Sequence, residues 1–164
     1  MTPAIYIVIP AKDEATRIGP VIRAVRAAGF DEIVVVDDGS TDATARVAAT
    51  AGATVLTHLI NLGAGAATQT GIEYAQEQGA DIIVTLDGDN QHYAEDIERL
   101  LAELQQQQLE VVIGSRFLER QSDIPTERVW YNRIANLLTA LTTGCYVSDS
   151  QSGMKAFRAG FARR

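Results

Sequence analysis

The chain has 164 residues, 46% hydrophobic and 21% charged, and this length and composition predict one globular domain (residues 1–164) with a substantial core. Its net charge of −7 argues against non-specific nucleic-acid binding, which requires a basic surface, so no nucleic-acid partner is expected. The single cysteine, Cys145, cannot form an internal disulfide, and no apolar run approaches the roughly 18 residues of a membrane span, so a cytoplasmic protein is expected.

Short runs rich in valine and isoleucine alternate along the chain with longer helical patterns. The apolar runs predict strands at residues 4–9, 32–36, 54–57, 81–86 and 110–114. The first helix is expected to contain Pro20 in its first turn and to stop at Gly29, and Ser40 or Thr41 is expected to cap the second. The third and fourth are expected at about residues 64–78 and 94–108. This alternation predicts an α/β fold, with a Rossmann-like, mostly parallel sheet flanked by helices.

The fourth predicted helix has a clear apolar stripe. The side chains expected on its buried face are Ile97, Leu100, Leu101 and Leu104. The glutamine run at residues 105–108 is interpreted as a solvated helix end.

Polar residues or glycines follow every predicted strand. In open parallel sheets, ligands bind beyond the carboxyl ends of the strands. The segments at these positions are residues 10–14, 37–42, 61–65, 87–91 and 114–116. Together they predict a rim that can hold a nucleotide, a metal ion and an anionic group.

Two carboxylates, Asp87 and Asp89, end the fourth apolar run and are separated by Gly88. A glycine tolerates the backbone angles that let both acids converge beyond a strand end. Clustered carboxylates there suit a hard divalent cation, Mg²⁺ or Mn²⁺, that holds a phosphorylated ligand. A solvated Asp-Gly turn is the alternative interpretation.

The other segments of the rim also allow two readings each. Asp37 and Asp38 can accept hydrogen bonds from a ribose or a base edge, or they can serve only in capping and turn formation. Residues 61–67 can present backbone N–H groups to phosphate at a helix N-terminus, or they can form a loop with packing glycines. Arg116 can neutralise a phosphate or form a surface salt bridge.

The ordered set of motifs resembles family 2 glycosyltransferases, and most closely their dolichyl-phosphate mannosyltransferase-like branch, which transfers sugars to polyprenyl phosphates. The motifs lie at residues 8–14, 32–42, 61–65, 87–92, 114–116 and 149–153, in the order of the family. The resemblance covers essentially the whole chain and implies a GT-A fold. It also implies transfer, with inversion, of a sugar from a UDP- or GDP-linked donor to a polyprenyl phosphate, with a metal assisting the departure of the nucleoside diphosphate.

The resemblance assigns roles to particular residues. The substrate-binding residues that it implies are Pro10, Glu14, Asp37, Asp38, Gly65, Asp87, Arg116 and Arg133, with Asp37 at the nucleotide and both arginines at the acceptor phosphate. The metal ligands are Asp87, Asp89 and Gln91, for Mg²⁺ or Mn²⁺. The catalytic residues are Asp89 and Asp149, and Asp149 occupies the position of an acidic catalytic candidate in the wider family.

Two departures from the family pattern keep other functions open. Ala64 stands where a lysine is usual, which removes one phosphate-neutralising charge. The chain ends at Arg164, whereas catalytic domains of the family usually continue for several more elements, so a C-terminally truncated domain is expected. The alternatives are a transferase with a soluble or polysaccharide acceptor and a catalytically silent, nucleotide-sugar-binding fragment.

Residues 129–147 are the ambiguous part of the chain. Their apolar side chains can rest on a membrane, with Arg128 and Arg133 near lipid phosphates, or can form an ordinary core-facing helix. The first reading predicts peripheral contact with the cytoplasmic membrane face. An exposed apolar face would also favour a homo-oligomer.

Overall fold

The computed structural model describes residues 3–86, 94–114 and 154–161. Within these ranges the chain forms six strands and four helices. They are β1 (Ile5–Ala11), α1 (Ile18–Ala27), β2 (Ile33–Asp37), α2 (Thr44–Thr50), β3 (Thr54–Thr57), α3 (Ala64–Glu77), β4 (Ile82–Thr85), α4 (Ala94–Gln106), β5 (Val111–Ile113) and β6 (Lys155–Arg158). All five predicted strands are present, and β1 extends two residues beyond its predicted end.

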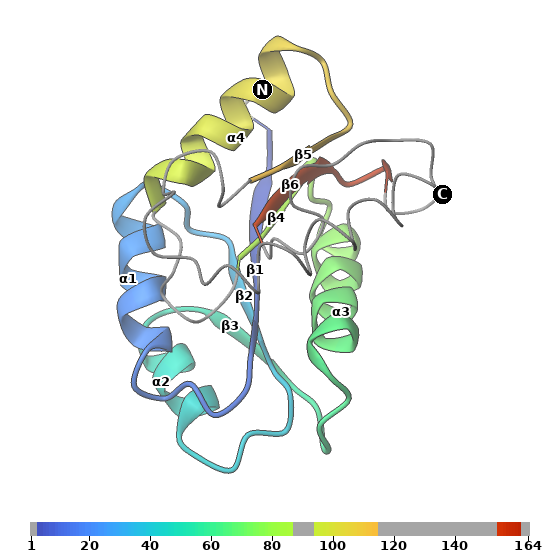
Figure 1. Cartoon of the computed structure of the whole chain (residues 1–164). Helices are drawn as coiled ribbons and strands as arrows, with labels where there is room; N and C mark the ends of the chain where they lie inside the picture. Colours follow the sequence, from blue (N-terminus) through green and yellow to red (C-terminus); the bar gives the residue numbers. More distant parts are fainter. Residues whose placement is uncertain (1–2, 87–93, 115–153, 162–164) are drawn as a thin grey trace, which may run out of the picture.

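The strands form one sheet in the order β3-β2-β1-β4-β6-β5 (Figure 1). The first four are parallel to one another, which confirms the mostly parallel sheet. β6 is antiparallel to both β4 and β5, so β5 runs in the same direction as β4. β6 was not predicted, because its four residues begin and end with basic side chains and contribute no long apolar run.

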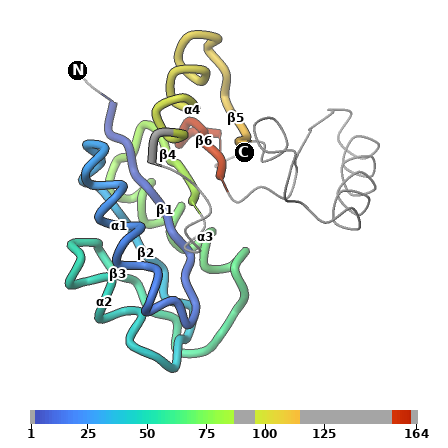
Figure 2. The backbone as a smooth tube through the Cα atoms, turned by 60° about the vertical axis from the view of Figure 1, so that its left-hand side comes forward, coloured from blue at the N-terminus to red at the C-terminus, as the bar shows by residue number. Residues whose placement is uncertain are grey.

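The sheet is covered on both faces, as its nearly continuous apolar strands predicted. Helix α3 covers one face, and α1, α2 and α4 cover the other (Figures 1 and 2). Successive strand residues point to opposite faces, so Ile7 and Ile9 of β1 pack with α1 and α4, whereas Val8 packs on the α3 side. The predicted apolar stripe of α4 is buried in the same hydrophobic cluster as Ile7 and Ile9, and the glutamine-rich end of α4 is exposed.

The four helices end in the same way. In each, the amide two residues past the helix cap bonds back across the last turn, as Phe30 N does to Val25 O and Leu109 N does to Leu104 O. Gly29 takes the left-handed conformation that this ending requires, with φ 89°, so it stops α1 as predicted.

The predicted start of the second helix is wrong. α2 begins at Thr44, and its N-cap residue is Ala43, which makes no side-chain hydrogen bond to the helix. The Thr44 amide donates instead to Asp42 Oδ1 at 2.9 Å. The Ser40 and Thr41 side chains instead bind Asp13, in the loop after β1. A tertiary contact therefore takes the hydroxyl groups that the local pattern assigned to a cap.

Gly71 lets α3 approach the sheet closely, and Gly71→Ala is expected to lower the free energy of unfolding by about 2 kcal/mol. A Cβ at this position would overlap a methyl group of Val8 and lie 3.1 Å from one of Val36. Gly65, in the same helix, has no atom within 4 Å of such a Cβ. Gly65→Ala is therefore expected to be neutral or to stabilise the fold by up to about 1 kcal/mol, through helix propensity. Urea unfolding of both variants checks the pair, and equal shifts would contradict the close approach.

Candidate functional site

The loops that follow β1, β2 and β3 lie at one edge of the sheet, here called the ligand edge. β4 and β5 also end there, and β6 begins there, because Thr85 and Ile113 both pair with Lys155. The amide of Gly114 donates to Met154 O at 2.9 Å, which joins the end of β5 to the start of β6. β1 is the switch point of the sheet, with β2 on one side and β4 on the other, which is where open α/β sheets bind ligands.

Pro10 lies at this switch point, within the central strand β1. Along β1, the backbone N–H and C=O groups of successive residues point alternately toward β2 and β4, and those of Pro10 are on the β4 side. The described bonds to β4 end at Leu86, whose amide donates to Val8 O at 3.0 Å. A proline, which has no amide hydrogen, is therefore tolerated here because the described ladder ends before it.

The loops after β1 and β2 are tied together by side chains. Asp13 Oδ1 accepts hydrogen bonds from the amide of Thr41 at 2.8 Å and from its hydroxyl at 3.2 Å, and the Asp13 amide donates to Ser40 Oγ at 2.9 Å. One turn further, Thr44 Oγ1 accepts from the amide of Glu14 at 2.8 Å and donates to Asp42. The two loops thus form one hydrogen-bonded unit before any ligand binds.

The carboxylates of this unit are stabilised in their ionised form. The Thr41 amide and the nearby Lys12 ammonium lower the pKa of Asp13, despite partial desolvation. The Thr44 hydroxyl, followed by the Thr44 and Ala15 amides, lowers the pKa of Asp42. Both side chains are therefore anionic acceptors well below neutral pH.

Asp38 ties the third loop to the second. Its Oδ1 accepts from the amide of Leu62 and from His58 Nδ1, both at 2.8 Å, and its Oδ2 accepts from the amide of Gly63 at 2.7 Å. The other ring nitrogen of His58, Nε2, lies 3.0 Å from Thr70 Oγ1 in α3. Burial, which leaves Asp38 only 3% exposed, tends to raise its pKa, but the bonds from Leu62, His58 and Gly63 outweigh it and lower the pKa.

Gly39 brings the same loops into direct backbone contact. Its φ is 66°, and a Cβ would lie 2.7 Å from the backbone of both Ile60 and Asn61. No side chain fits between these backbones, so a glycine is required. The loop from β3 to α3 is therefore fixed through Asp38 on one side and packed against Gly39 on the other.

Two predicted substrate-binding acids, Asp37 and Glu14, have oxygens that the described chain does not fully use. Asp37 is 4% exposed, and its Oδ1 accepts from the amide of Ser40 at 3.2 Å. Glu14 Oε2 is buried and has no hydrogen-bond partner within the described residues, although Arg17 Nε lies 3.2 Å away in an ion pair. Both acids therefore have hydrogen-bonding capacity that the described residues do not use.

The first turn of α3 is open to solvent. Gly63 occupies the cap position with φ 95°, and no described side chain caps the helix. Ala64 and Gly65 are exposed, so the backbone N–H groups of this turn can reach an anionic ligand.

The structure brings five of the predicted site residues to one edge of the sheet: Pro10, Glu14, Asp37, Asp38 and Gly65. The remaining six lie outside the described residues: Asp87, Asp89, Gln91, Arg116, Arg133 and Asp149. Within the described ranges no group of three acidic, histidine or cysteine side chains could hold a metal ion, so the metal prediction rests on residues outside them.

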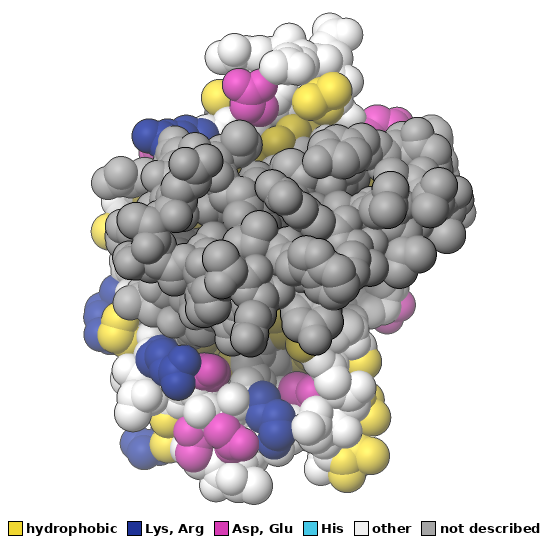
Figure 3. Space-filling model, viewed as in Figure 1, with side chains coloured by type: hydrophobic (Ala, Val, Ile, Leu, Met, Phe, Trp, Pro, Cys, Tyr) yellow, Lys and Arg dark blue, Asp and Glu magenta, His cyan; other side chains and the backbone are white. Residues whose placement is uncertain are grey.

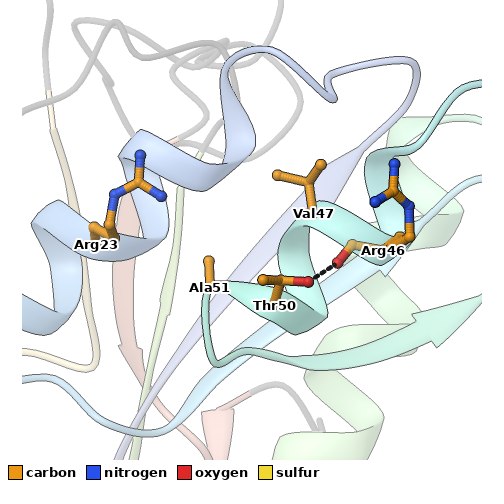
Figure 4. Close-up of a pocket in the computed structure, with 5 residues that line it drawn as sticks. All are labelled: Arg23, Arg46, Val47, Thr50 and Ala51. Carbon is orange, nitrogen blue, oxygen red and sulfur yellow. Dashed lines mark hydrogen bonds between the residues drawn. The ribbon is translucent and has the colours of Figure 1, made fainter.

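The hydrogen-bond network that positions this edge was not predicted from the sequence. No bonding role between loops was predicted for Asp13, Asp42, Thr44 or His58, although acids and hydroxyls in consecutive strand-to-helix loops are a recognisable signal for such bonding. A separate hollow of about 290 Å³ lies between α1 and α2, where Arg23 and Arg46 flank Val47 (Figure 4). It belongs to the helical layer and not to the loops of the ligand edge.

The sequence matches the profile of the family described as glycosyl transferase family 2 over residues 6–164. It is 34% identical to the UDP-N-acetylglucosamine–dolichyl-phosphate N-acetylglucosaminyltransferase of Methanococcus voltae, covering 93% of this chain and 68% of that protein. It is 31% identical to the dodecaprenyl-phosphate galacturonate synthase of Rhizobium johnstonii, covering 96% of this chain and 48% of that protein.

The fold is shared with solved structures. Glucosyl-3-phosphoglycerate synthase of Mycobacterium tuberculosis, in complex with Mn²⁺ and UDP-glucose, superimposes with a TM-score of 0.73 and 26% identity, over 97% of this chain and 57% of that one. Its complex with phosphoglyceric acid gives a TM-score of 0.73 and 25% identity, over 97% and 58%. The predicted GT-A fold is thereby confirmed, and the chain spans about half to two thirds of the length of these relatives.

None of the helices in the described ranges is long and apolar enough to cross a membrane. The segment predicted to rest on a membrane surface, residues 129–147, lies outside those ranges.

Proposed function

Because the chain belongs to glycosyl transferase family 2, we propose that it binds a nucleotide-sugar donor at the ligand edge and transfers the sugar to a polyprenyl phosphate. The observation that carries this proposal is the set of loops locked together around Asp37, Glu14 and the open first turn of α3. Relatives named for dolichyl-phosphate and dodecaprenyl-phosphate substrates support the choice of acceptor.

The donor is proposed to lie across the ends of β1 and β2. Asp37 accepts hydrogen bonds from the ribose or base, and Pro10 and Glu14 line the same end of the sheet. The N–H groups near Gly65 face the donor phosphates. Because Ala64 stands where the family usually has a lysine, no ammonium group is available there. The backbone N–H groups therefore supply more of the stabilisation of the phosphate charge.

Asp87, Asp89 and Gln91 are proposed to hold Mg²⁺ or Mn²⁺ against the donor diphosphate. They follow Leu86, which lies at the ligand edge beside β1. When bound, the metal would stabilise the charge on the departing nucleoside diphosphate. The Mn²⁺ in the structure of the related synthase is consistent with this role.

Arg116 and Arg133 are proposed to bind the acceptor phosphate, with Asp149 as the acidic group of the acceptor site. A phosphate oxygen is already ionised near neutral pH, so positioning contributes more than removal of a proton. A single displacement then inverts the sugar. The second candidate function uses a soluble phosphorylated acceptor, and it is favoured by the likeness to the synthase bound to phosphoglyceric acid.

The proposal is tested by incubating the chain with labelled nucleotide sugars, Mn²⁺ or Mg²⁺, and either a polyprenyl phosphate or phosphoglyceric acid. Product on the lipid supports the leading function, and product on the soluble acid supports the second. Metal-dependent donor binding without transfer would indicate a silent binding fragment. Absence of metal-dependent nucleotide binding would overturn the proposal.

Asp89→Ala is expected to lower metal-dependent donor binding by at least about a hundredfold, because loss of a carboxylate ligand weakens the metal site by several kcal/mol. Calorimetric titration of UDP- and GDP-sugars with Mn²⁺ measures the change. Asp31→Ala is the matched control, since Asp31 precedes β2 at the opposite edge and its side chain is 76% exposed. Unchanged binding by Asp89→Ala would show that the two acids form only a turn.

A further inference from the structure

Three large apolar side chains are exposed together in the loop from β3 to α3. Leu59 is 100% exposed, Ile60 67% and Leu62 55%, and they are called here the apolar tip. The other two exposed large hydrophobic residues among those described, Leu109 and Phe161, lie near the start of β5 and after β6, at the opposite edge of the sheet. Among the described residues, the exposed large hydrophobic side chains at the ligand edge therefore all lie in one loop.

The apolar tip cannot easily turn its side chains inward. Asp38 holds the amides of Leu62 and Gly63, and the backbone of Ile60 packs against Gly39. His58, just before the tip, is fixed by Asp38 and Thr70. The loop thus holds its apolar side chains in water in a fixed geometry. A partner that covers them loses little binding free energy to ordering the loop.

The charge of the chain offers no attraction to anionic lipid. The adjoining loops carry Asp13, which pairs with Lys12, and Asp42, and the whole chain has a net charge of −7. Figure 3 shows hydrophobic side chains where the β3–α3 connection lies, with both acidic and basic side chains nearby. A chain with this net charge gains no overall attraction from anionic lipid, so its attraction to a bilayer must come from the apolar groups.

We propose that the apolar tip inserts into the surface of a lipid bilayer and turns the ligand edge toward the membrane. This inference rests on the proposed function, because a polyprenyl phosphate acceptor presents its phosphate at the bilayer surface. Inserting Leu59, Ile60 and Leu62 would place that phosphate next to the loops that are proposed to hold the donor. The membrane contact then comes from the donor half of the chain, in addition to the contact expected at residues 129–147.

The test is flotation of the chain with vesicles of pure phosphatidylcholine, without donor, metal or polyprenyl phosphate. The wild type is expected to bind, and 0.5 M salt is expected to leave the binding unchanged or to strengthen it. The double variant Leu59→Ser/Ile60→Ser is expected to bind at least tenfold more weakly, since each of these side chains contributes roughly tenfold or more when it leaves water. Leu109→Ser, at the opposite edge, is the matched control and is expected to bind like the wild type.

A second variant guards against a misfolded double mutant. Leu59→Trp is expected to bind more tightly than the wild type and to show a blue-shifted fluorescence increment with vesicles, because tryptophan favours the bilayer interface. The proposal is overturned if the wild type does not bind, if the double variant binds equally well, or if the tip instead mediates a dimer seen by ultracentrifugation. Donor binding measured in solution without lipid fails or succeeds independently of this result, so the two proposals are tested separately.

Discussion

Asp38→Ala is expected to lower the free energy of unfolding by about 3 kcal/mol. The substitution removes the acceptor of two backbone amides and of His58 Nδ1, and these donors lie in a part-buried site. Each buried group without its partner costs about 1–3 kcal/mol, and partial access of water reduces the sum. Urea unfolding followed by circular dichroism measures the change.

The matched control is Asp31→Ala. Asp31 forms an exposed ion pair with Arg26, so its loss is expected to cost less than about 1 kcal/mol. Comparing stability with donor affinity separates two roles for Asp38. A residue that only contacts the nucleotide would lose affinity at unchanged stability, whereas a residue that holds the loop loses both. An Asp38→Ala variant as stable as the wild type would contradict the structural role described above.

The same carboxylate gives stability a defined dependence on pH. The pKa of Asp38 is lowered by folding, so its contribution is present above the unfolded value near 3.8 and is lost as the pH falls through the lower folded value. Asp13 and Asp42 act in the same direction. The wild type is therefore expected to lose stability on acidification below about pH 4, and Asp38→Asn is expected to make that loss shallower. Unfolding curves between pH 2.5 and about 6 provide the measurement.

Gly39→Ala is expected to lower the free energy of unfolding by about 3 kcal/mol. Its positive φ disfavours any residue with a Cβ by about 1 kcal/mol, and the remainder comes from overlap with the backbone of Ile60 and Asn61. That backbone cannot rotate away as a flexible side chain can, because Asp38 fixes the next two amides. The loop must shift as a whole, so weaker donor binding is expected together with the loss of stability.

Gly29→Ala is the control for the backbone part of this cost. Gly29 has a similar positive φ of 89°, but a Cβ there would have nothing within 4 Å. Its substitution is expected to cost about 1 kcal/mol, through conformation alone. If the two variants were equally destabilised, the close approach at Gly39 would carry no energy and the loop would not be held as described.

The α/β fold was predictable because the strands are continuous apolar runs and the helices have clear stripes and stops. The predicted range 54–57 coincides with β3, although that strand is only partly buried. β6 was not predictable from local pattern, since Lys155 and Arg158 enter the sheet only through pairing with β4 and β5. The start of α2 was wrong because Ser40 and Thr41 bind a residue 27 or 28 positions away.

The position of the candidate site could be predicted from the sequence, but the roles of its individual residues could not. Parallel strands bring their carboxyl ends to one edge, so Glu14, Asp37 and Asp38 were expected together and are found there. The sequence could not distinguish Asp37, which retains capacity for a ligand, from Asp38, which holds a loop. That difference depends on which amides reach each carboxylate, and it arises only when three loops pack together.

The bond between Gly114 and Met154 has a consequence for how the chain can vary. It joins the residues on either side of the segment 115–153 on neighbouring strands. The pairing of β5 with β6 therefore uses no hydrogen bond from within that segment. Doubling the length of such a segment costs only about 0.6 kcal/mol of closure entropy. Under the proposed function, the described loops after β1, β2 and β3 bind the donor, and two of the proposed acceptor groups, Arg116 and Arg133, fall within residues 115–153. Transplanting the corresponding segment from a relative is expected to alter acceptor choice while leaving nucleotide preference with the host.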